Sequence, residues 1–148
     1  MVMVGHLLVP VLDTLPASVS KVVVTDLLRK KMKFRGLIIT DALGMEGVLE
    51  PFGGSGAKAT LAAYKAGVDI LLMPDNVSES IDLIVDYIGD DRRKLKDLDA
   101  RVSRVLALKG KCGKLTGRDD LSVDPAAVDT KGTDALITTI EETLAAGR

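Results

Sequence analysis

Hydrophobic residues follow two patterns along this chain, short continuous runs and longer stretches with helical spacing. The runs at residues 1–9, 37–40 and 68–73 are rich in valine, isoleucine and leucine and show no alternation with polar residues. Such runs are typical of strands that are covered on both faces, as in parallel sheets. Between and after them, the spacing of apolar residues predicts helices over residues 20–32, 57–66, 77–88 and 95–108.

The order of these elements predicts a parallel α/β architecture, because each helix that links two parallel strands covers one face of the sheet. A complete (β/α)8 barrel takes about 250 residues, so a chain of 148 residues fits part of a barrel or a small open sheet. We expect residues 1–110 to contain about three parallel βα units plus a closing helix. Residues 111–148 turn polar before a weak helical pattern, and we expect a linker and a loosely packed helical tail there.

Composition excludes several classes of partner. The formal net charge is −1 with acids and bases mixed throughout, which leaves no basic surface for nucleic acid or an anionic membrane. The apolar runs are far shorter than the roughly 20 residues of a membrane-spanning helix, and the first residues do not form a signal peptide. A cytoplasmic location is therefore favoured for the chain as given. With a single cysteine, Cys112, and no soft ligand near it in the sequence, we expect no metal and no cofactor.

Three residues near the predicted strand ends are candidates for chemistry, because functional groups gather at the carboxyl ends of parallel strands. Asp41 follows the second strand, and its pattern fits a helix cap or turn as well as catalysis. His6 lies within the first apolar run, where a hydrogen-bonded core histidine and a substrate contact are both open. Met45 follows Asp41 closely and fits a packing residue.

Two further segments favour structural roles. The glycine-rich segment 53–56 stands ahead of a predicted helix and could offer backbone N–H groups to an anion. It lacks the lysine and hydroxyl residue of a P-loop, so a flexible loop is the preferred interpretation. Asp75 and Asn76 precede the helix predicted at Val77, and we interpret them as its cap.

Taken together, four ordered motifs resemble glycoside hydrolase family 3, in its bacterial β-N-acetylhexosaminidase branch. They are Val-Met-Val-Gly-His at 2–6, Leu-Pro-Ala-Ser at 15–18, Phe-Arg-Gly-Leu-Ile-Ile-Thr-Asp-Ala-Leu-Gly-Met at 34–45, and Ala-Gly-Val-Asp-Ile-Leu-Leu-Met-Pro at 66–74. The resemblance covers residues 1–109 and implies the C-terminal portion of a (β/α)8 barrel. It also implies that Asp41 is the nucleophile of a retaining glycosidase. His6 then matches a supporting or sugar-contacting histidine, and Met45 a loop residue near the sugar.

The residue after Asp41 bears on the substrate that this resemblance implies. Relatives specialised as β-glucosidases usually carry tryptophan there, whereas this chain has Ala42 and contains no tryptophan. The resemblance therefore implies a substrate with a terminal β-linked N-acetylglucosamine, as found in peptidoglycan fragments during their recycling. A substrate with a glucose-type sugar is the other option.

Departures from the family pattern limit what this chain is expected to do alone. The branch uses a histidine on an earlier loop as proton donor and a Lys-His pair to grip the sugar, but His6 is the only histidine here and matches another position. Loss of a general acid costs on the order of 10²–10⁴ in rate. We therefore expect a truncated glycosidase that is inactive without the missing segment. The alternatives are a non-catalytic α/β fragment that self-associates or pairs with another chain to cover its sheet edges, and a small-molecule or phosphate binder.

Overall fold

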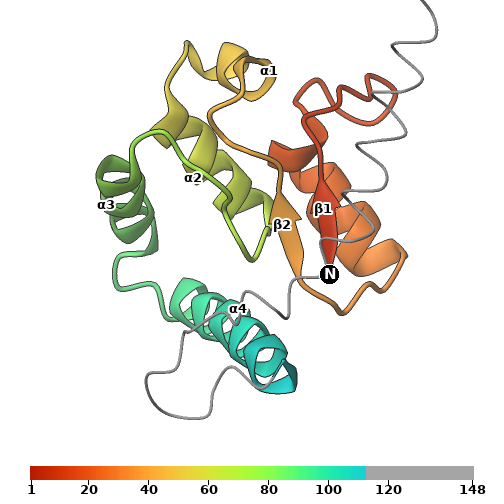
Figure 1. The fold of residues 1–148 in the computed structure, drawn as a ribbon, viewed down its shortest axis with the longest axis vertical. Helices are drawn as coiled ribbons and strands as arrows, with labels where there is room; N and C mark the ends of the chain where they lie inside the picture. The colour runs from red at the N-terminus through yellow and green to blue at the C-terminus, as the bar shows by residue number, and fades with distance from the viewer. Residues whose placement is uncertain (113–148) are drawn as a thin grey trace, which may run out of the picture. The chain divides into compact units, whose positions relative to one another are not determined.

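The computed structural model describes residues 1–112, which fold as a parallel α/β unit (Figure 1). Its regular elements follow one another in chain order: β1 (Val2–Val4), η1 (Ala17–Val19), η2 (Val22–Lys31), β2 (Ile38–Thr40), α1 (Glu46–Leu49), η3 (Glu50–Phe52), α2 (Gly56–Ala66), α3 (Val77–Ile88) and α4 (Arg92–Lys111). The predicted alternation of strands and helices is therefore present as far as β2 and α2, whereas no strand element separates α2 from α3. The predicted linker and tail at 111–148 lie outside the described residues, apart from the first two.

The sheet is smaller than the sequence predicts. β1 and β2 pair in parallel, with Val2 opposite Ile38 and Val4 opposite Thr40. The third predicted strand, 68–73, is reduced to a single parallel bridge between Ile39 and Ile70, and the first apolar run forms a strand over three residues instead of nine. Within residues 1–112 both outer segments pair with β2 alone, so fewer hydrogen bonds hold them in an extended ladder.

The helices agree more closely with the prediction. α3 covers the predicted range 77–88, and α2 begins one residue earlier than expected. α4 is longer than the predicted 95–108 at both ends. The segment between the first two strands is helical but winds as a π-helix, with a hydrogen bond from Met32 N–H to the Leu27 carbonyl oxygen.

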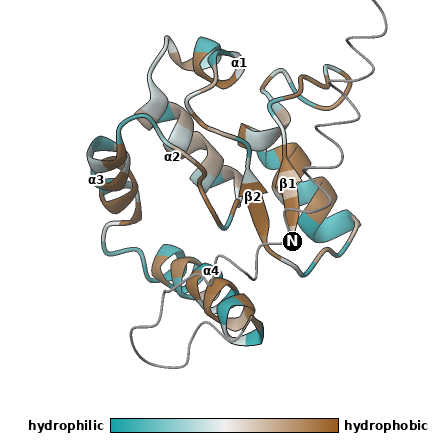
Figure 2. Ribbon diagram, in the orientation of Figure 1, coloured by the Kyte–Doolittle hydropathy of each residue, from teal (hydrophilic) through white to brown (hydrophobic). Residues whose placement is uncertain are grey.

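Two buried clusters join the helices to the sheet. One is formed by residues from η1, the loop after β2, α1 and α2: Val19, Leu43, Val48, Ala59 and Ala63. The other lies against β2 and contains Val24, Ile38, Ala66 and Val68. The alanines of α2 allow this helix to approach the sheet closely, and apolar colouring runs through β2 in Figure 2. Within residues 1–112, no helix combines the length and apolar character needed to cross a membrane.

Candidate active site

The backbone at Asp41 is held from three directions. Its N–H donates to the Val4 carbonyl oxygen at 3.1 Å, which extends the β1–β2 pairing by one step. Two residues further on, Leu43 N–H donates to the Leu72 carbonyl oxygen at 2.9 Å, and the Leu43 side chain is 0% exposed in the core. These hydrogen bonds hold the loop after Asp41 to β1 on one side of β2 and to the segment at Leu72 on the other. The buried Leu43 side chain holds the same loop on the core.

The Asp41 carboxylate is half-buried at this strand end, where its Oδ1 accepts a hydrogen bond from Ala42 N–H at 2.8 Å. This is a local, turn-type contact with the next residue. The next helix, α1, begins at Glu46, and Met45 occupies its cap position without a side-chain capping bond. Asp41 therefore does not cap a helix, and that alternative is wrong, whereas its contact with Ala42 N–H is of the turn type. Its carboxylate makes no further hydrogen bond or ion pair within residues 1–112.

His6 links the end of β1 to the loop after Asp41. Its Nε2 lies 2.9 Å from the Ala42 carbonyl oxygen, and its Nδ1 lies 2.6 Å from Ser18 Oγ. A carbonyl oxygen only accepts, so Nε2 carries a proton in this arrangement and donates it. In the neutral ring Nδ1 must then accept from the Ser18 hydroxyl, which is 0% exposed. Both ring nitrogens are thus engaged within the protein.

Met45 lies on the same loop, with its side chain directed to solvent. Its N–H donates to the Ala42 carbonyl oxygen at 3.1 Å, so that oxygen receives bonds from both Met45 and His6. The Met45 side chain is 49% exposed, so the interpretation of Met45 as a packing residue is wrong.

The helix caps differ in part from the prediction. Asn76 caps α3, because its Oδ1 accepts from Glu79 N–H at 3.2 Å and its amide donates to the Glu79 carboxylate at 2.9 Å. Asp75 does not share this role. Its carboxylate packs against Gly44 and Gly56, where an added Cβ would come within 2.3 Å and 3.0 Å of its oxygens.

The glycine-rich segment 53–56 forms the turn that leads into α2. Gly53 and Gly54 adopt left-handed backbone angles of +63° and +79°, which ends the short helix η3. Ser55 then caps α2 by accepting from Lys58 N–H at 3.3 Å. The segment is therefore a defined turn and cap.

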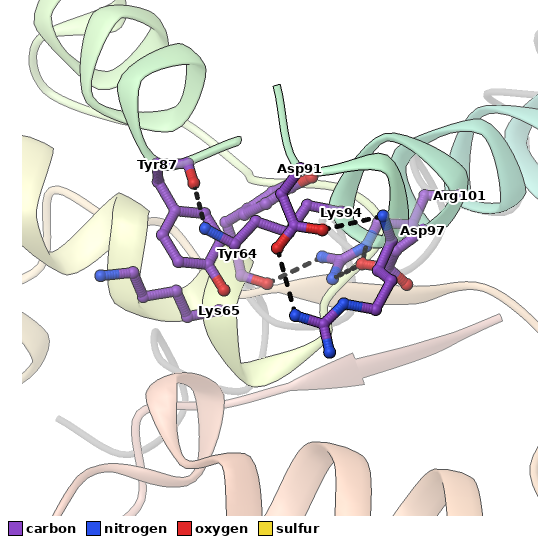
Figure 3. Close-up of a pocket in the computed structure, with 8 residues that line it drawn as sticks. Tyr64, Lys65, Tyr87, Asp91, Lys94, Asp97 and Arg101 are labelled. Carbon is purple, nitrogen blue, oxygen red and sulfur yellow. Dashed lines mark hydrogen bonds and ion pairs between the residues drawn. The ribbon is translucent and has the colours of Figure 1, made fainter. Parts of the chain in front are cut away.

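Three of the cavities in the described part of the chain lie away from Asp41, which lines none of these three. The first, of about 310 Å³, lies between the ends of α2, α3 and α4, and Figure 3 shows its lining. There the Lys65 and Lys94 ammonium groups lie 4.6 Å and 3.9 Å from the centre of the Tyr87 ring. A second cavity, of about 280 Å³, adjoins Met1 and the end of α4. The third lies between α3 and α4.

The prediction from sequence missed a buried ion-pair network at the start of β2. The Asp69 carboxylate is fully buried and accepts from Arg104 Nε at 2.9 Å, from Arg104 Nη2 at 2.8 Å and from Ile38 N–H at 2.8 Å. It also pairs with Arg29 of η2. Burial is the main cause that lowers the pKa of Arg29, and the nearby Asp69 opposes it. One carboxylate thus joins β2, η2 and α4.

Arg101 provides the second attachment of α4 to the rest of the unit. Its Nη1 donates to the carbonyl oxygens of Tyr64 and Val68, each at 2.8 Å, and its guanidinium lies 4.2 Å from the centre of the Tyr64 ring. Asp97 accepts from its Nε at 2.9 Å (Figure 3). Arg101 and Arg104 stand three residues apart on α4, so both side chains leave this helix on one side. Within residues 1–112 no group of three acidic, histidine or cysteine side chains could hold a metal ion.

Comparison with known proteins identifies the family. The model of the Glycosyl hydrolase family 3 N terminal domain matches residues 1–108, which include β1, β2 and the whole Asp41 loop. The chain belongs to glycoside hydrolase family 3. The N-terminal domain of this family has a TIM-barrel-like α/β fold, and the parallel pairing of β1 with β2 agrees with it.

Relatives of known name are β-hexosaminidases and related glycosidases. The Beta-hexosaminidase A of Pseudoalteromonas piscicida is 29% identical over 132 residues, which cover 75% of this family 3 chain and 22% of the relative. The Beta-N-acetylglucosaminidase/beta-glucosidase of Cellulomonas fimi is 32% identical over 123 residues, covering 76% of this chain and 22% of the relative. The chain therefore spans less than a quarter of these two relatives.

A solved structure shows the same relationship in space. The glycoside hydrolase family 3 β-N-acetylglucosaminidase from Paenibacillus sp. str. FPU-7 superimposes with a TM-score of 0.69 at 26% identity, covering 83% of this chain and 24% of that one. The same fold is thus found as about a quarter of a longer protein.

Proposed function

We propose that this chain is the nucleophile-bearing part of a retaining glycoside hydrolase that hydrolyses O-glycosyl bonds, with Asp41 as nucleophile. The observation that carries the proposal is the geometry of Asp41. Its half-buried carboxylate stands at the carboxyl end of a central parallel strand, and its only hydrogen bond within residues 1–112 comes from Ala42 N–H. Membership of family 3 supports the same assignment, because the matched region includes this loop.

The proposed chemistry uses the ionised form of Asp41. One carboxylate oxygen attacks the anomeric carbon as the glycosidic bond breaks, which gives a covalent glycosyl-enzyme and a protonated leaving group. Water then attacks the same carbon, gives one proton to the group that had protonated the leaving group, and releases the sugar and the free carboxylate. A fixed carboxylate lowers the barrier by stabilising positive charge on the sugar in both transition states. The ties at Val4 and Leu43 supply this fixed position.

His6 and Met45 would support the sugar site in different ways. His6 donates to the Ala42 carbonyl oxygen at 2.9 Å, so we assign it the role of holding the loop that carries the nucleophile. Met45 presents an exposed thioether at the same strand end and would contact the apolar face of the sugar.

The proton donor would come from outside this chain. The described residues around Asp41 offer no second acid in contact with it. We therefore expect activity only when the remaining part of a family 3 barrel is present.

The proposed substrate is a carbohydrate with a terminal β-linked N-acetylglucosamine. Support comes from Ala42 after the nucleophile and from relatives named as β-hexosaminidases and as a β-N-acetylglucosaminidase. Peptidoglycan fragments are one source of this sugar, and a glucose-type substrate is the second option.

A chromogenic assay tests the proposal. The chain alone should release no nitrophenol from 4-nitrophenyl N-acetyl-β-glucosaminide. Co-expression with the remaining barrel segment of a relative should restore release, and Asp41→Asn should abolish it, whereas Asp26→Asn on the exposed face of η2 should not. Full turnover by the isolated chain, or by the Asp41→Asn variant in the complex, would contradict the proposal.

A second candidate function is a non-catalytic fragment that assembles with another chain. The observation that favours it is a group of exposed apolar side chains on and after the outer strand: Met1, Met3, Leu7, Leu8 and Val11. Exposed apolar surface next to an open strand edge invites pairing. An assembled complex that lacks activity with several β-glycosides would favour this candidate.

A further inference from the structure

We propose that the cavity between the ends of α2 and α3 and the start of α4 binds a phosphate group, carried by a small phosphate monoester or present as free phosphate. The inference goes beyond the proposed function and does not depend on the catalytic role of Asp41. Four observations on the described residues carry it: the completeness of the cavity, an excess of positive charge on its lining, an aromatic ring that holds two ammonium groups, and a buried hydroxyl without a partner.

The cavity is formed within one compact unit of the chain. Its volume is about 310 Å³, at the lower end of the range of about 300–1,000 Å³ that is usual for small-molecule sites. All of its lining residues lie between Tyr64 and Arg101, and Figure 3 shows their side chains converging from three helices. A ligand site in this place can therefore be tested on the chain alone.

The charges on the lining do not cancel. Four cationic and two anionic side chains line the cavity, which leaves an excess of two positive charges. Lys65 and Lys94 make no ion pair within residues 1–112. A phosphate monoester carries a charge of about −1.5 to −2 at pH 7, which matches this excess. Each of the two carboxylates on the lining is already paired with an arginine: Asp97 with Arg101 at 2.9 Å, and Asp91 with Arg93 at 3.5 Å.

The Tyr87 ring brings the two unpaired ammonium groups together. Lys65 Nζ lies 4.6 Å and Lys94 Nζ 3.9 Å from the ring centre. Lys94 also donates to the Tyr87 carbonyl oxygen, as Figure 3 shows. Two ammonium groups that are held near one ring repel each other, and a bound dianion would replace this repulsion by two attractions.

Tyr64 provides a buried donor on the same lining. It is 6% exposed, yet its hydroxyl has no hydrogen-bond partner within residues 1–112. Burial is the main cause that raises the pKa of Tyr64, so the hydroxyl keeps its proton at neutral pH. The other groups that affect this pKa are Arg101, Asp97 and Tyr87, which all line the cavity. A phosphate oxygen would give this hydroxyl a charged acceptor.

The walls of the cavity are fixed before any ligand binds. Arg101 is 7% exposed, and its Nη1 donates to the carbonyl oxygens of Tyr64 and Val68, each at 2.8 Å. The rings of Tyr64 and Tyr87 meet edge to face, with their centres 6.2 Å apart. A site that is already ordered loses less entropy when it binds a ligand.

A purely structural role accounts for only part of this cluster. Arg101 and Lys94 each donate to a backbone carbonyl oxygen and so hold α4 to its neighbours. Lys65, by contrast, makes no hydrogen bond or ion pair within residues 1–112 and has only its contact with the Tyr87 ring. The Tyr64 hydroxyl likewise serves no structural contact there. These two groups point to a ligand.

Isothermal titration calorimetry of the 148-residue chain tests the site with two probes, inorganic phosphate and glycerol 2-phosphate, at constant ionic strength. Saturable 1:1 binding is expected, with a rise in melting temperature. Lys65→Gln should weaken binding roughly fivefold or more, because one charge-assisted contact is lost. Lys58→Gln is the matched control, since Lys58 is exposed at the other end of the same helix, and it should leave binding unchanged.

Tyr64→Phe separates a ligand contact from a structural role. It should weaken phosphate binding several-fold without lowering the melting temperature of the ligand-free chain, because the hydroxyl has no partner to lose. Circular dichroism melts check that Lys65→Gln folds like the unsubstituted chain. Tighter binding of glycerol 2-phosphate would assign the site to monoesters, and tighter binding of inorganic phosphate would assign it to free phosphate.

Two results would overturn the inference. One is the lack of saturable binding, with phosphate acting no differently from sodium chloride at equal ionic strength. The other is binding that Lys65→Gln and Tyr64→Phe both leave unchanged. None of these measurements uses glycosidase activity, so their failure would leave the proposed function standing, and an inactive barrel complex would leave this inference standing.

Discussion

The Nε2 atom of His6 lies 2.9 Å from the carbonyl oxygen of Ala42, the residue that follows the candidate nucleophile. The opposite ring nitrogen lies 2.6 Å from the fully buried Ser18 hydroxyl. The serine hydroxyl donates to Nδ1 and so favours the tautomer with its proton on Nε2. This is the tautomer that can donate to the Ala42 carbonyl oxygen. One imidazole thus connects the end of β1, η1 and the loop after β2.

We predict that His6→Ala destabilises the chain by about 1–3 kcal/mol, because it leaves the buried Ser18 hydroxyl without its acceptor. Ser18→Ala should cost less, since the bond to Ala42 remains. Urea unfolding followed by circular dichroism measures both. Hydrogen exchange at Leu43 should accelerate in His6→Ala more than in Ser18→Ala. Equal exchange in the two variants would contradict a loop-holding role.

Replacing Asp69 should be the most damaging charge change in the described unit. Asp69→Asn leaves two guanidinium groups next to a buried amide, so the free energy of unfolding should fall by about 3–5 kcal/mol. Asp26→Asn is the matched control, because its pair with Lys30 is exposed and should matter far less. Chemical denaturation of both variants gives the comparison, and similar losses would contradict the proposed network.

Substitution by alanine should have opposite effects on stability at two glycines. Gly67 has φ = +105°, and a Cβ there would lie 2.5 Å from Thr25 Oγ1, so Gly67→Ala should destabilise by about 1–3 kcal/mol. Gly47 lies within α1 with open space around it, and Gly47→Ala should be neutral or gain up to about 1 kcal/mol. Thermal melts measure both changes. A loss at Gly47 as large as that at Gly67 would contradict the backbone described here.

Acid should weaken two local structures first. The pKa of Asp13 is lowered chiefly by the hydrogen bond from Ser20, and that of Asp91 by the N–H of Arg93 at the start of α4. A lowered folded-state pKa means that the stabilisation is complete above the ordinary value of 3.8 and is lost as pH falls through the lower folded value. Urea unfolding from pH 7 to pH 2 should show a drop below about pH 4 that is smaller in Asp13→Asn and Asp91→Asn.

Much of the helical architecture could be predicted from sequence, because local signals decide it. Apolar spacing gave the bounds of α3, and Gly67 marked the end of α2. The third strand could not be predicted in the same way. Its apolar run is as strong as that of β2, but its pairing with β2 is limited to the single bridge between Ile39 and Ile70, and an apolar run does not by itself set how far such a pairing extends.

Site chemistry was predicted less completely than the fold. The position of Asp41 at a strand end followed from the pattern, whereas the engagement of both His6 nitrogens depends on residues 12 and 36 positions away. Asp69 looked like a motif residue, and its burial against two arginines appears only when three distant segments meet. Tertiary contacts of this kind leave little trace in local sequence.

Covalent trapping tests the central claim most directly. The chain assembled with the remaining barrel segment is treated with a 5-fluoro-N-acetylglucosaminyl fluoride, which slows hydrolysis of the glycosyl-enzyme, and is then digested for mass spectrometry. The account predicts one sugar adduct, on the peptide that contains Asp41, and none in Asp41→Asn. An adduct on a different carboxylate, with Asp41 unmodified, would contradict it.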